Sequence, residues 1–327
     1  MKKLFFSLAL LCLSTVSYAQ NTLVGTLTHG EDITMYYGIY ALKNAYDAAV
    51  DGDVINLSGG DFQAVNITKA ITLRGVGIDN VHPTTISNDF DINTASEGDL
   101  RFSMEGIKCN NTISVKGVSN PYLIKCCFGN LWISNASQNV MFVNCKITWG
   151  LYVIENSSCQ LLNSYIANYN VWDDGSKGST LNCILEVANY YDFTNYVNTQ
   201  FLNCILYCLR GFEGTAIPST SIATNCVAIG MPNCFNNSQY NPNCYHASFQ
   251  EVFKEFTGTY SDTETFELTE TAKALFLGTD DTQVGLYGGL MPYSSTPSYP
   301  QITKMNVANK TTADGKLSVD IEVSAVQ

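Results

Sequence analysis

A repeat with a period near 20 residues runs through the middle of this 327-residue chain. Its anchor positions follow one another at steps of 19, 19, 19, 19, 21 and 22 residues: Ile107, Cys126, Cys145, Ser164, Cys183, Cys204 and Cys226. A fixed period of this length indicates one supersecondary unit stacked many times. The unit is too short for a helix pair but long enough for short strands with their turns. The repeat predicts an all-β fold, a right-handed parallel β-helix solenoid of about 11 coils.

The residue before each anchor predicts a bend in every coil. This residue is Asn or Gly in six of the seven coils, and Lys125 is the exception. Asn and Gly tolerate the left-handed backbone conformation that a sharp bend between two buried strands needs. Because stacked strands repeat at about 4.8 Å, we expect the Asn side chains to form a structural amide ladder.

The N-terminus predicts export. Lys2 and Lys3 precede an apolar stretch at 4–13, and Ser17-Tyr18-Ala19 matches a signal-peptidase site. We therefore expect residues 1–19 to be a signal peptide of a secreted protein, found outside the cell, on its surface or in the periplasm. The apolar stretch is too short for a membrane span, and no second one follows, so we expect no transmembrane segment.

The charge of the mature chain excludes some partners. Without Lys2 and Lys3, 15 basic residues face 29 acidic ones, a net charge of −14. Such a surface repels nucleic acid and anionic membranes, so we expect no nucleic-acid partner. It also disfavours polyanionic glycans unless a local basic patch or a metal offsets the field.

The cysteines suit a buried ladder better than a disulfide framework. Five of the eleven mature cysteines are repeat anchors, and neighbours about 4.8 Å apart with parallel side chains are poorly shaped for bridges. We expect these five to be free, buried thiols. Cys234 and Cys244 lie in an Asn/Pro-rich stretch, and the sequence leaves open whether they form a disulfide.

Flanking motifs suggest a family. Residues 39–50 have helical periodicity, and 52–77 contain Gly-Asp-Val-Ile-Asn-Leu, Gly-Gly-Asp-Phe and Lys-Ala-Ile-Thr-Leu-Arg-Gly. This order resembles the entry to the pectate-lyase-like β-helix superfamily, where a short helix caps the open end. The stretch 266–289 resembles the closing motif of secreted β-helix proteins, although Asp281 and Ala272-Lys273 depart from it. The expected layout is a β-helix over 20–292, including a capping helix at 39–50, then a linker and tail over 293–327.

Three aromatic residues are candidates for glycan binding. Trp132 and Tyr152 each lie between two aliphatic residues, and Trp172 follows Val171. The three residues fall at the same place in successive coils, and Tyr190 or Tyr191 extends the row. Aliphatic neighbours that point inward would leave the rings outside, where flat sugar faces stack. The alternatives are an aromatic stack under a loop and rings turned into the core.

Carboxylates beside this row are candidates for catalysis or for calcium. Glu155 and Asp174 are 19 residues apart, Asp173 adjoins, and Lys177 follows. Close carboxylates either share a proton or bind a cation. The resemblance to pectate lyases implies calcium on this face and a basic residue beside the sugar, for which Lys177, Lys146 and Lys125 are available. A solvated acidic turn is the alternative, and no cofactor is otherwise indicated.

Two classes of function therefore compete. No catalytic motif of the superfamily can be placed on the chain, which favours a non-catalytic protein that binds a polysaccharide or cell-surface glycan, or that has a structural role at the surface. The alternative is a polysaccharide lyase or glycosidase that acts on an extended polysaccharide.

Overall fold

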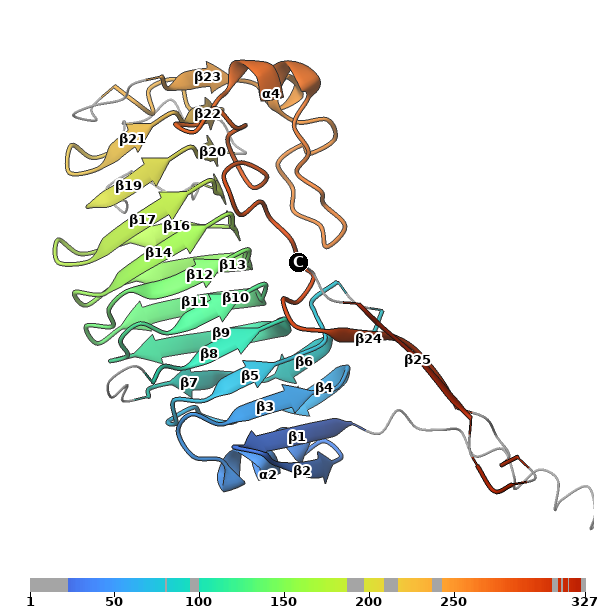
Figure 1. The fold of residues 1–327 in the computed structure, drawn as a ribbon. Helices are drawn as coiled ribbons and strands as arrows, with labels where there is room; N and C mark the ends of the chain where they lie inside the picture. Colours follow the sequence, from blue (N-terminus) through green and yellow to red (C-terminus); the bar gives the residue numbers. More distant parts are fainter. Residues whose placement is uncertain are drawn as a thin grey trace, which may run out of the picture.

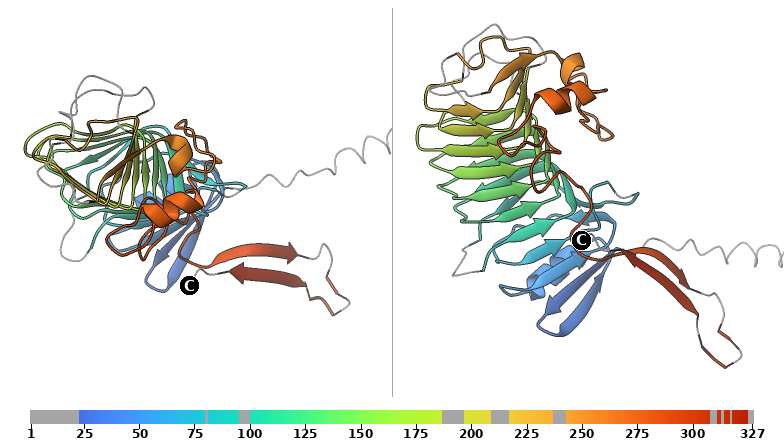
Figure 2. Two further views of the ribbon diagram at one scale, coloured as in Figure 1. Left: turned by 90° about the horizontal axis from the view of Figure 1, so that it is seen from above. Right: turned by 45° about the horizontal axis from the view of Figure 1, so that its top comes forward.

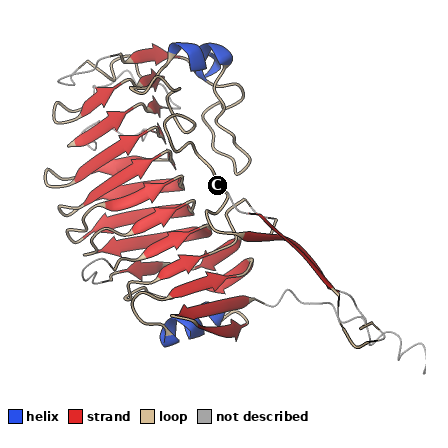
Figure 3. Ribbon diagram, in the orientation of Figure 1, coloured by secondary structure: helices blue, strands red, loops and turns tan. Residues whose placement is uncertain are grey.

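The protein is a parallel β-helix. The computed structural model describes residues 23–79, 81–94, 100–186, 197–208, 217–236, 243–307, 311–312, 314–316 and 318–324. Strands stack into a solenoid of about nine turns with few helices, as Figures 1 and 3 show. The predicted fold class is confirmed, and the expected 11 coils are too many. The proposed signal peptide at 1–19 lies outside the described residues.

Two long sheets form the walls of the solenoid, and neighbouring coils pair in parallel. The first sheet runs in the order β2 (Asp32–Tyr37), β1 (Val24–His29), β3 (Val54–Leu57), β5 (Thr72–Arg74), β8 (Ser103–Glu105), β10 (Tyr122–Ile124), β12 (Val140–Val143), β14 (Ser158–Leu162), β17 (Lys177–Leu181), β19 (Thr199–Leu202) and β21 (Ile222–Thr224). Only the β1–β2 and β1–β3 pairs are antiparallel in this sheet.

The second sheet carries both candidate sites described below. Its order is β23 (Tyr245–Ala247), β22 (Val227–Ile229), β20 (Ile205–Tyr207), β18 (Ile184–Glu186), β15 (Tyr165–Ile166), β13 (Lys146–Val153), β11 (Cys127–Ser134), β9 (Ile107–Lys116), β6 (Thr84–Ser87) and β4 (Gly60–Gln63). In addition, β16 (Tyr169–Val171) pairs with β13, and β7 (Phe90–Ile92) pairs with β9.

The cysteine ladder is confirmed as a buried row of free thiols. Cys126, Cys145, Cys183, Cys204 and Cys226 have no exposed surface. Each thiol donates to a backbone carbonyl, as Cys145 does to Leu123 at 3.3 Å. Cys244 immediately precedes β23, and Tyr245 pairs with Val227, so Cys244 follows Cys226 in the stack and the row continues one coil further than the sequence suggested. Neither Cys234 nor Cys244 is in a disulfide.

A second polar ladder lies inside the turns. Ser137, Ser157 and Ser176 are fully buried. The backbone N–H of Ser137 donates to Ser157 Oγ at 3.1 Å, and that of Ser157 donates to Ser176 Oγ at 3.1 Å. These hydroxyls accept hydrogen bonds from backbone donors in the interior, where an unpaired donor is costly.

The bend positions are left-handed, as predicted, but the Asn side chains do not form an amide ladder. Backbone φ angles lie near +50° at the expected residues: Lys125, Asn144, Asn163, Asn182, Asn203 and Asn225. Several of these amides instead bind the C-terminal segment. Asn163 Nδ2 donates to the carbonyls of Leu286 and Gly288 at 2.9 and 2.8 Å, and Asn225 Nδ2 donates to Leu277 O at 2.8 Å.

The N-terminal end is closed by a helix. The predicted helix at 39–50 is present as α2 (Ala41–Ala48), which buries Ala41, Leu42, Ala45 and Tyr46 against the first coil. Lys69 Nζ donates to the carbonyl of Tyr46 at 2.6 Å and to that of Ala49 at 2.7 Å, which satisfies acceptors at the end of the helix. A cap is required because a terminal coil otherwise exposes the core.

The coil count is lower than expected because the chain leaves the solenoid after β23. Two short helices, α3 (Phe249–Val252) and α4 (Glu270–Leu275), sit at the C-terminal end. A second apolar cluster forms where this region covers the outer face of β15, β18, β20 and β22, including Phe256 and Phe266 against Tyr165 and Ile205.

Residues 277–299, here called the strap, then run back along the row of bends toward the first coils (Figures 1 and 2). At its far end Lys125 Nζ donates to Ser298 Oγ at 3.0 Å, and Tyr299 Oη donates to Gly75 O. The strap therefore ties late coils to early ones through side chains of the bend row.

The tail beyond the strap is a hairpin. β24 (Gln301–Val307) and β25 (Val319–Ser324) pair with each other only and project from the solenoid (Figures 1 and 2). Among the described residues, no helix is long and apolar enough to span a bilayer.

Candidate functional site

The three predicted aromatic residues form one cluster on the outer surface. The rings of Trp132 and Tyr152 stack with centroids 4.3 Å apart and planes at 18°. Trp172 contacts both, at 5.2 Å from the Tyr152 ring and 5.8 Å from the Trp132 ring. Trp132 and Tyr152 are half-buried and Trp172 is 46% exposed, so these rings are not core residues.

The predicted register of Trp172 is wrong. Trp132 pairs with Tyr152, but Tyr152 pairs with Asn170. The register of β16 is offset by two residues from the predicted one, so Tyr169 and Val171 take the inward positions and are fully buried. Because β16 is short, Trp172 already begins the turn that follows. The rings therefore form a compact cluster instead of a column with one ring per coil. Tyr190 and Tyr191 lie outside the described residues.

A glycine and an asparagine position the central ring. A Cβ at Gly150 would lie 2.7–2.9 Å from the outer ring atoms of Tyr152, so only glycine leaves room for the ring to lie over the backbone. Asn168 Nδ2 donates to Tyr152 Oη at 2.9 Å. Burial raises the pKa of Tyr152, so its hydroxyl stays protonated at neutral pH.

The predicted carboxylates act as turn caps. Glu155 Oε2 accepts the backbone N–H of Asn135 at 2.9 Å. Asp173 accepts from the backbone N–H of Ser176 at 2.8 Å and from Ser176 Oγ at 2.9 Å. Burial raises the pKa of Asp173, but these hydrogen bonds outweigh it, and the net pKa is lowered. Asp174 is exposed.

These residues therefore do not assemble a charged catalytic cluster. Lys177 is exposed, and its backbone N–H pairs with Ser157 O. Across the described part of the chain, no group of three His, Cys, Asp or Glu side chains is placed to hold a metal ion. Calcium at Glu155, Asp173 and Asp174 stays a prediction.

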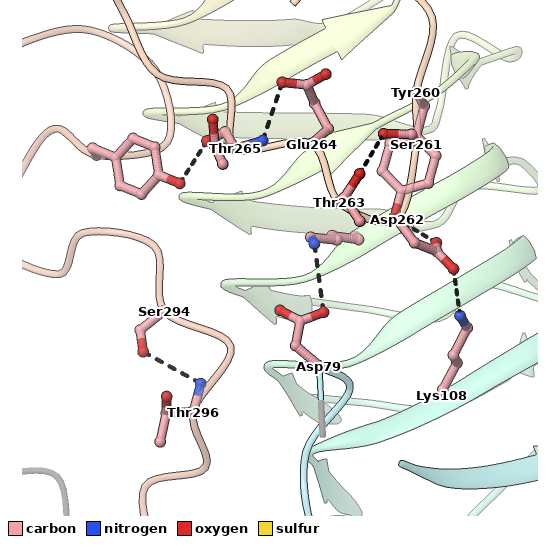
Figure 4. A network of polar contacts seen from close by, with 12 residues as sticks. Asp79, Lys108, Tyr260, Ser261, Asp262, Thr263, Glu264, Thr265, Ser294 and Thr296 are labelled. Atoms are coloured by element: carbon pink, nitrogen blue, oxygen red, sulfur yellow. Dashed lines mark hydrogen bonds and ion pairs between the residues drawn. The ribbon is translucent and has the colours of Figure 1, made fainter. Parts of the chain in front are cut away.

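A polar cleft lies further back on the same strands. Its floor is the column Lys108, Cys127 and Lys146, which are in register at the starts of β9, β11 and β13. Loop 260–265 and the strap form its walls, and a cavity of about 670 Å³ remains between them. Figure 4 shows the polar contacts that surround it.

Two ion pairs of different geometry cross the cleft. Lys108 Nζ donates to Asp262 Oδ2 at 2.9 Å, and this bond lowers the pKa of Asp262. Lys146 is only 4% exposed, and its Nζ lies 3.8 Å from Asp79 Oδ1, too far for a hydrogen bond. The ammonium also lies 5.7 Å from the centre of the Tyr293 ring.

Apart from Glu264, the other lining groups are aromatic or neutral. Tyr260 Oη donates to Asp262 Oδ1 at 3.2 Å, and Tyr287 Oη donates to Thr265 O at 2.6 Å. Burial raises the pKa of Cys127 to about 11, despite the opposing effect of the two lysines, so the thiol is neutral.

Sequence reasoning missed this cleft, although one signal was present. The residue after each repeat anchor is apolar or aromatic in the later coils, as at Tyr165, Ile184 and Ile205, but is lysine at 108 and 146. In the later coils this position packs under the C-terminal region. Lysine at the same position in earlier coils indicates that a polar cavity, rather than apolar packing, lies between the sheet and the segment that covers it. The loop residues Asp79 and Asp262 carry no such signal, because their approach depends on how distant loops fold.

Comparisons with family models, with curated proteins and with solved structures found no match to this chain.

Proposed function

We propose that this is a secreted β-helix protein that binds a polysaccharide or cell-surface glycan without cleaving it. The observation that carries this proposal is the cluster of Trp132, Tyr152 and Trp172, whose rings remain partly accessible on the outer surface. Aromatic faces and edges pack well against the C–H faces of pyranose rings. A membership in the pectate-lyase-like superfamily would be consistent with this function.

The compact arrangement favours a single stacking surface rather than one sugar per coil. Trp132 and Tyr152 turn their faces toward each other, so Trp172 has the ring most available to a ligand. The net charge of −12 for the full chain favours a neutral glycan over a polyanion.

Affinity electrophoresis against a panel of neutral and acidic polysaccharides, with calcium or with EDTA, tests the proposal. Loss of one stacking contact of about 1 kcal/mol lowers affinity about fivefold. We therefore expect Trp172→Ala to bind about fivefold more weakly. Trp149→Ala is the matched control, because Trp149 is 57% exposed and lies outside the cluster. Retardation by no polysaccharide, or equal retardation of both variants, would refute the proposal.

The alternative, a polysaccharide lyase or glycosidase, is favoured by one observation. Lys146 lines the polar cleft, whereas Lys125 is bonded to Ser298 and Lys177 is exposed. New reducing ends, or unsaturated products with ultraviolet absorbance, would establish the enzymatic alternative. A Lys146→Met variant that lost this activity would identify the base.

A further inference from the structure

We propose that the polar cleft over Lys108 and Lys146 is a second binding site, which takes a neutral, polyhydroxylated ligand of one or two sugar rings. The proposal rests on the proposed function for its ligand class only. The site itself is separate, because the cleft lies at the opposite ends of β11 and β13 from Trp132 and Tyr152. Its volume of about 670 Å³ falls within the range of small-molecule sites.

Lys146 provides the first argument. Its side chain is 95% buried, and no described residue lies within hydrogen-bond distance of its ammonium. The ammonium opens onto the cleft, so a ligand there can supply acceptors for its three donors. An oxygen beside this pair, about 2.8 Å from both atoms, would accept from the ammonium and donate to the carboxylate. A hydroxyl group does both, whereas a carboxylate or phosphate only accepts.

Tyr293 provides an independent argument. Its hydroxyl is buried and has no hydrogen-bond partner within the described part of the protein. The residue lines the cleft, and its ring lies beside the Lys146 ammonium. Unsatisfied buried hydroxyls are rare in proteins and point to an unseen partner. This oxygen has almost no accessible surface, so a ligand oxygen in the cleft removes the deficit once the ring turns its hydroxyl toward the cavity.

The charges of the cleft select a neutral ligand. Lys108 and Lys146 are balanced by Asp79 and Asp262, and Glu264 adds a further negative charge. An anion would therefore meet a rim of carboxylates. The two ion pairs are two coils apart, about 10 Å, so a ligand of two sugar rings can contact both. The tyrosine rings at 260 and 287 add apolar wall for the C–H faces of a sugar.

Calorimetric titration of the mature protein tests this proposal. The probes are glucose, galactose, mannose, maltose, cellobiose and lactose, with galacturonate as the anionic comparison. At least one neutral probe should bind, and Lys146→Met should weaken it about tenfold, because a charged hydrogen bond is lost. Lys116→Met is the control, since Lys116 makes a half-exposed pair with Asp91 at 2.8 Å elsewhere on the same sheet.

Tyr293→Phe separates a binding role from a structural one. Removal of an unsatisfied hydroxyl should leave the unfolding midpoint unchanged or raised, while binding of the same sugar weakens. Three results would overturn the proposal: no binding of any neutral probe, binding that Lys146→Met and Tyr293→Phe leave intact, or preferential binding of galacturonate. Because Trp172 is outside the cleft, polysaccharide binding that depends on Trp172 but not on Lys146 would leave the proposed function standing alone.

Discussion

The contact between the bend row and the strap makes a quantitative prediction about Asn163. This side chain is 2% exposed, and its amide donates to two strap carbonyls at 2.9 and 2.8 Å. Its φ of +45° is one that glycine adopts freely, so Asn163→Gly removes the amide without straining the bend. Two neutral hydrogen bonds contribute about 1 kcal/mol each, so the loss should be about 2 kcal/mol.

Asn144 is the matched control. It is the bend residue of the preceding coil, with a φ of +55° and 4% exposure, but its amide oxygen has no hydrogen-bond partner within the described residues. Glycine raises the conformational entropy of the unfolded chain equally at both positions, so this contribution to the free energy of unfolding cancels in the comparison. Asn144→Gly should therefore be less destabilising than Asn163→Gly by about 2 kcal/mol.

Urea unfolding followed by circular dichroism measures the difference, provided that the denaturant slopes of the two variants agree. Limited proteolysis should also cut the strap of Asn163→Gly faster than that of Asn144→Gly, because the middle of the strap is released at Leu286 and Gly288. Equal midpoints and equal cleavage rates would refute the inference that the bend row holds the strap.

Three further predictions address the ladder, the turn and the cluster. The ladder thiols have no exposed surface, and burial raises the pKa of Cys145 to about 12. At pH 8 a thiol reagent should therefore leave the native ladder unmodified and react first with half-buried Cys244; rapid labelling of the ladder would contradict inward placement. The folded pKa of Asp173 is lowered, so its stabilisation is present above the unfolded pKa of about 3.9 and is lost as pH falls through the folded pKa. The gap in urea midpoint between wild type and Asp173→Asn should therefore close below about pH 4. Gly150→Ala should displace the Tyr152 ring and cost about 1–3 kcal/mol in unfolding, with weaker glycan binding; an unchanged midpoint would refute the close contact.

The solenoid itself followed from the sequence because a stacked coil is a local unit. The spacing of Cys126, Cys145 and Cys183 determines which residues lie over one another, and Asn at each bend determines where the backbone turns. These features depend on backbone conformation and nearest neighbours, which a repeat displays directly. The capping helix was readable for the same reason, since its apolar period is local.

The aromatic candidates show where this reasoning stops. The sequence indicated that Trp132 and Tyr152 are adjacent and outside the core, and the structure agrees. It misplaced Trp172, because a coil can shorten at its corner without disturbing the anchors on either side. The difference of two residues is small along the chain but decides whether the rings form a column or a cluster.

Only the tertiary structure decided how the C-terminal region covers the solenoid. The β-helix was expected to run to residue 292, but after β23 the chain packs over the outer face of the second sheet. The strap then returns along the bend row, binds the Asn amides and, with loop 260–265, encloses the cleft over Lys108 and Lys146. Lys108 and Asp262 are 154 residues apart, so no local pattern relates them. The repeat determines which side chains face outward in each coil. Which of these side chains are then covered depends on the packing of segments distant in sequence, and that packing is determined by the whole fold.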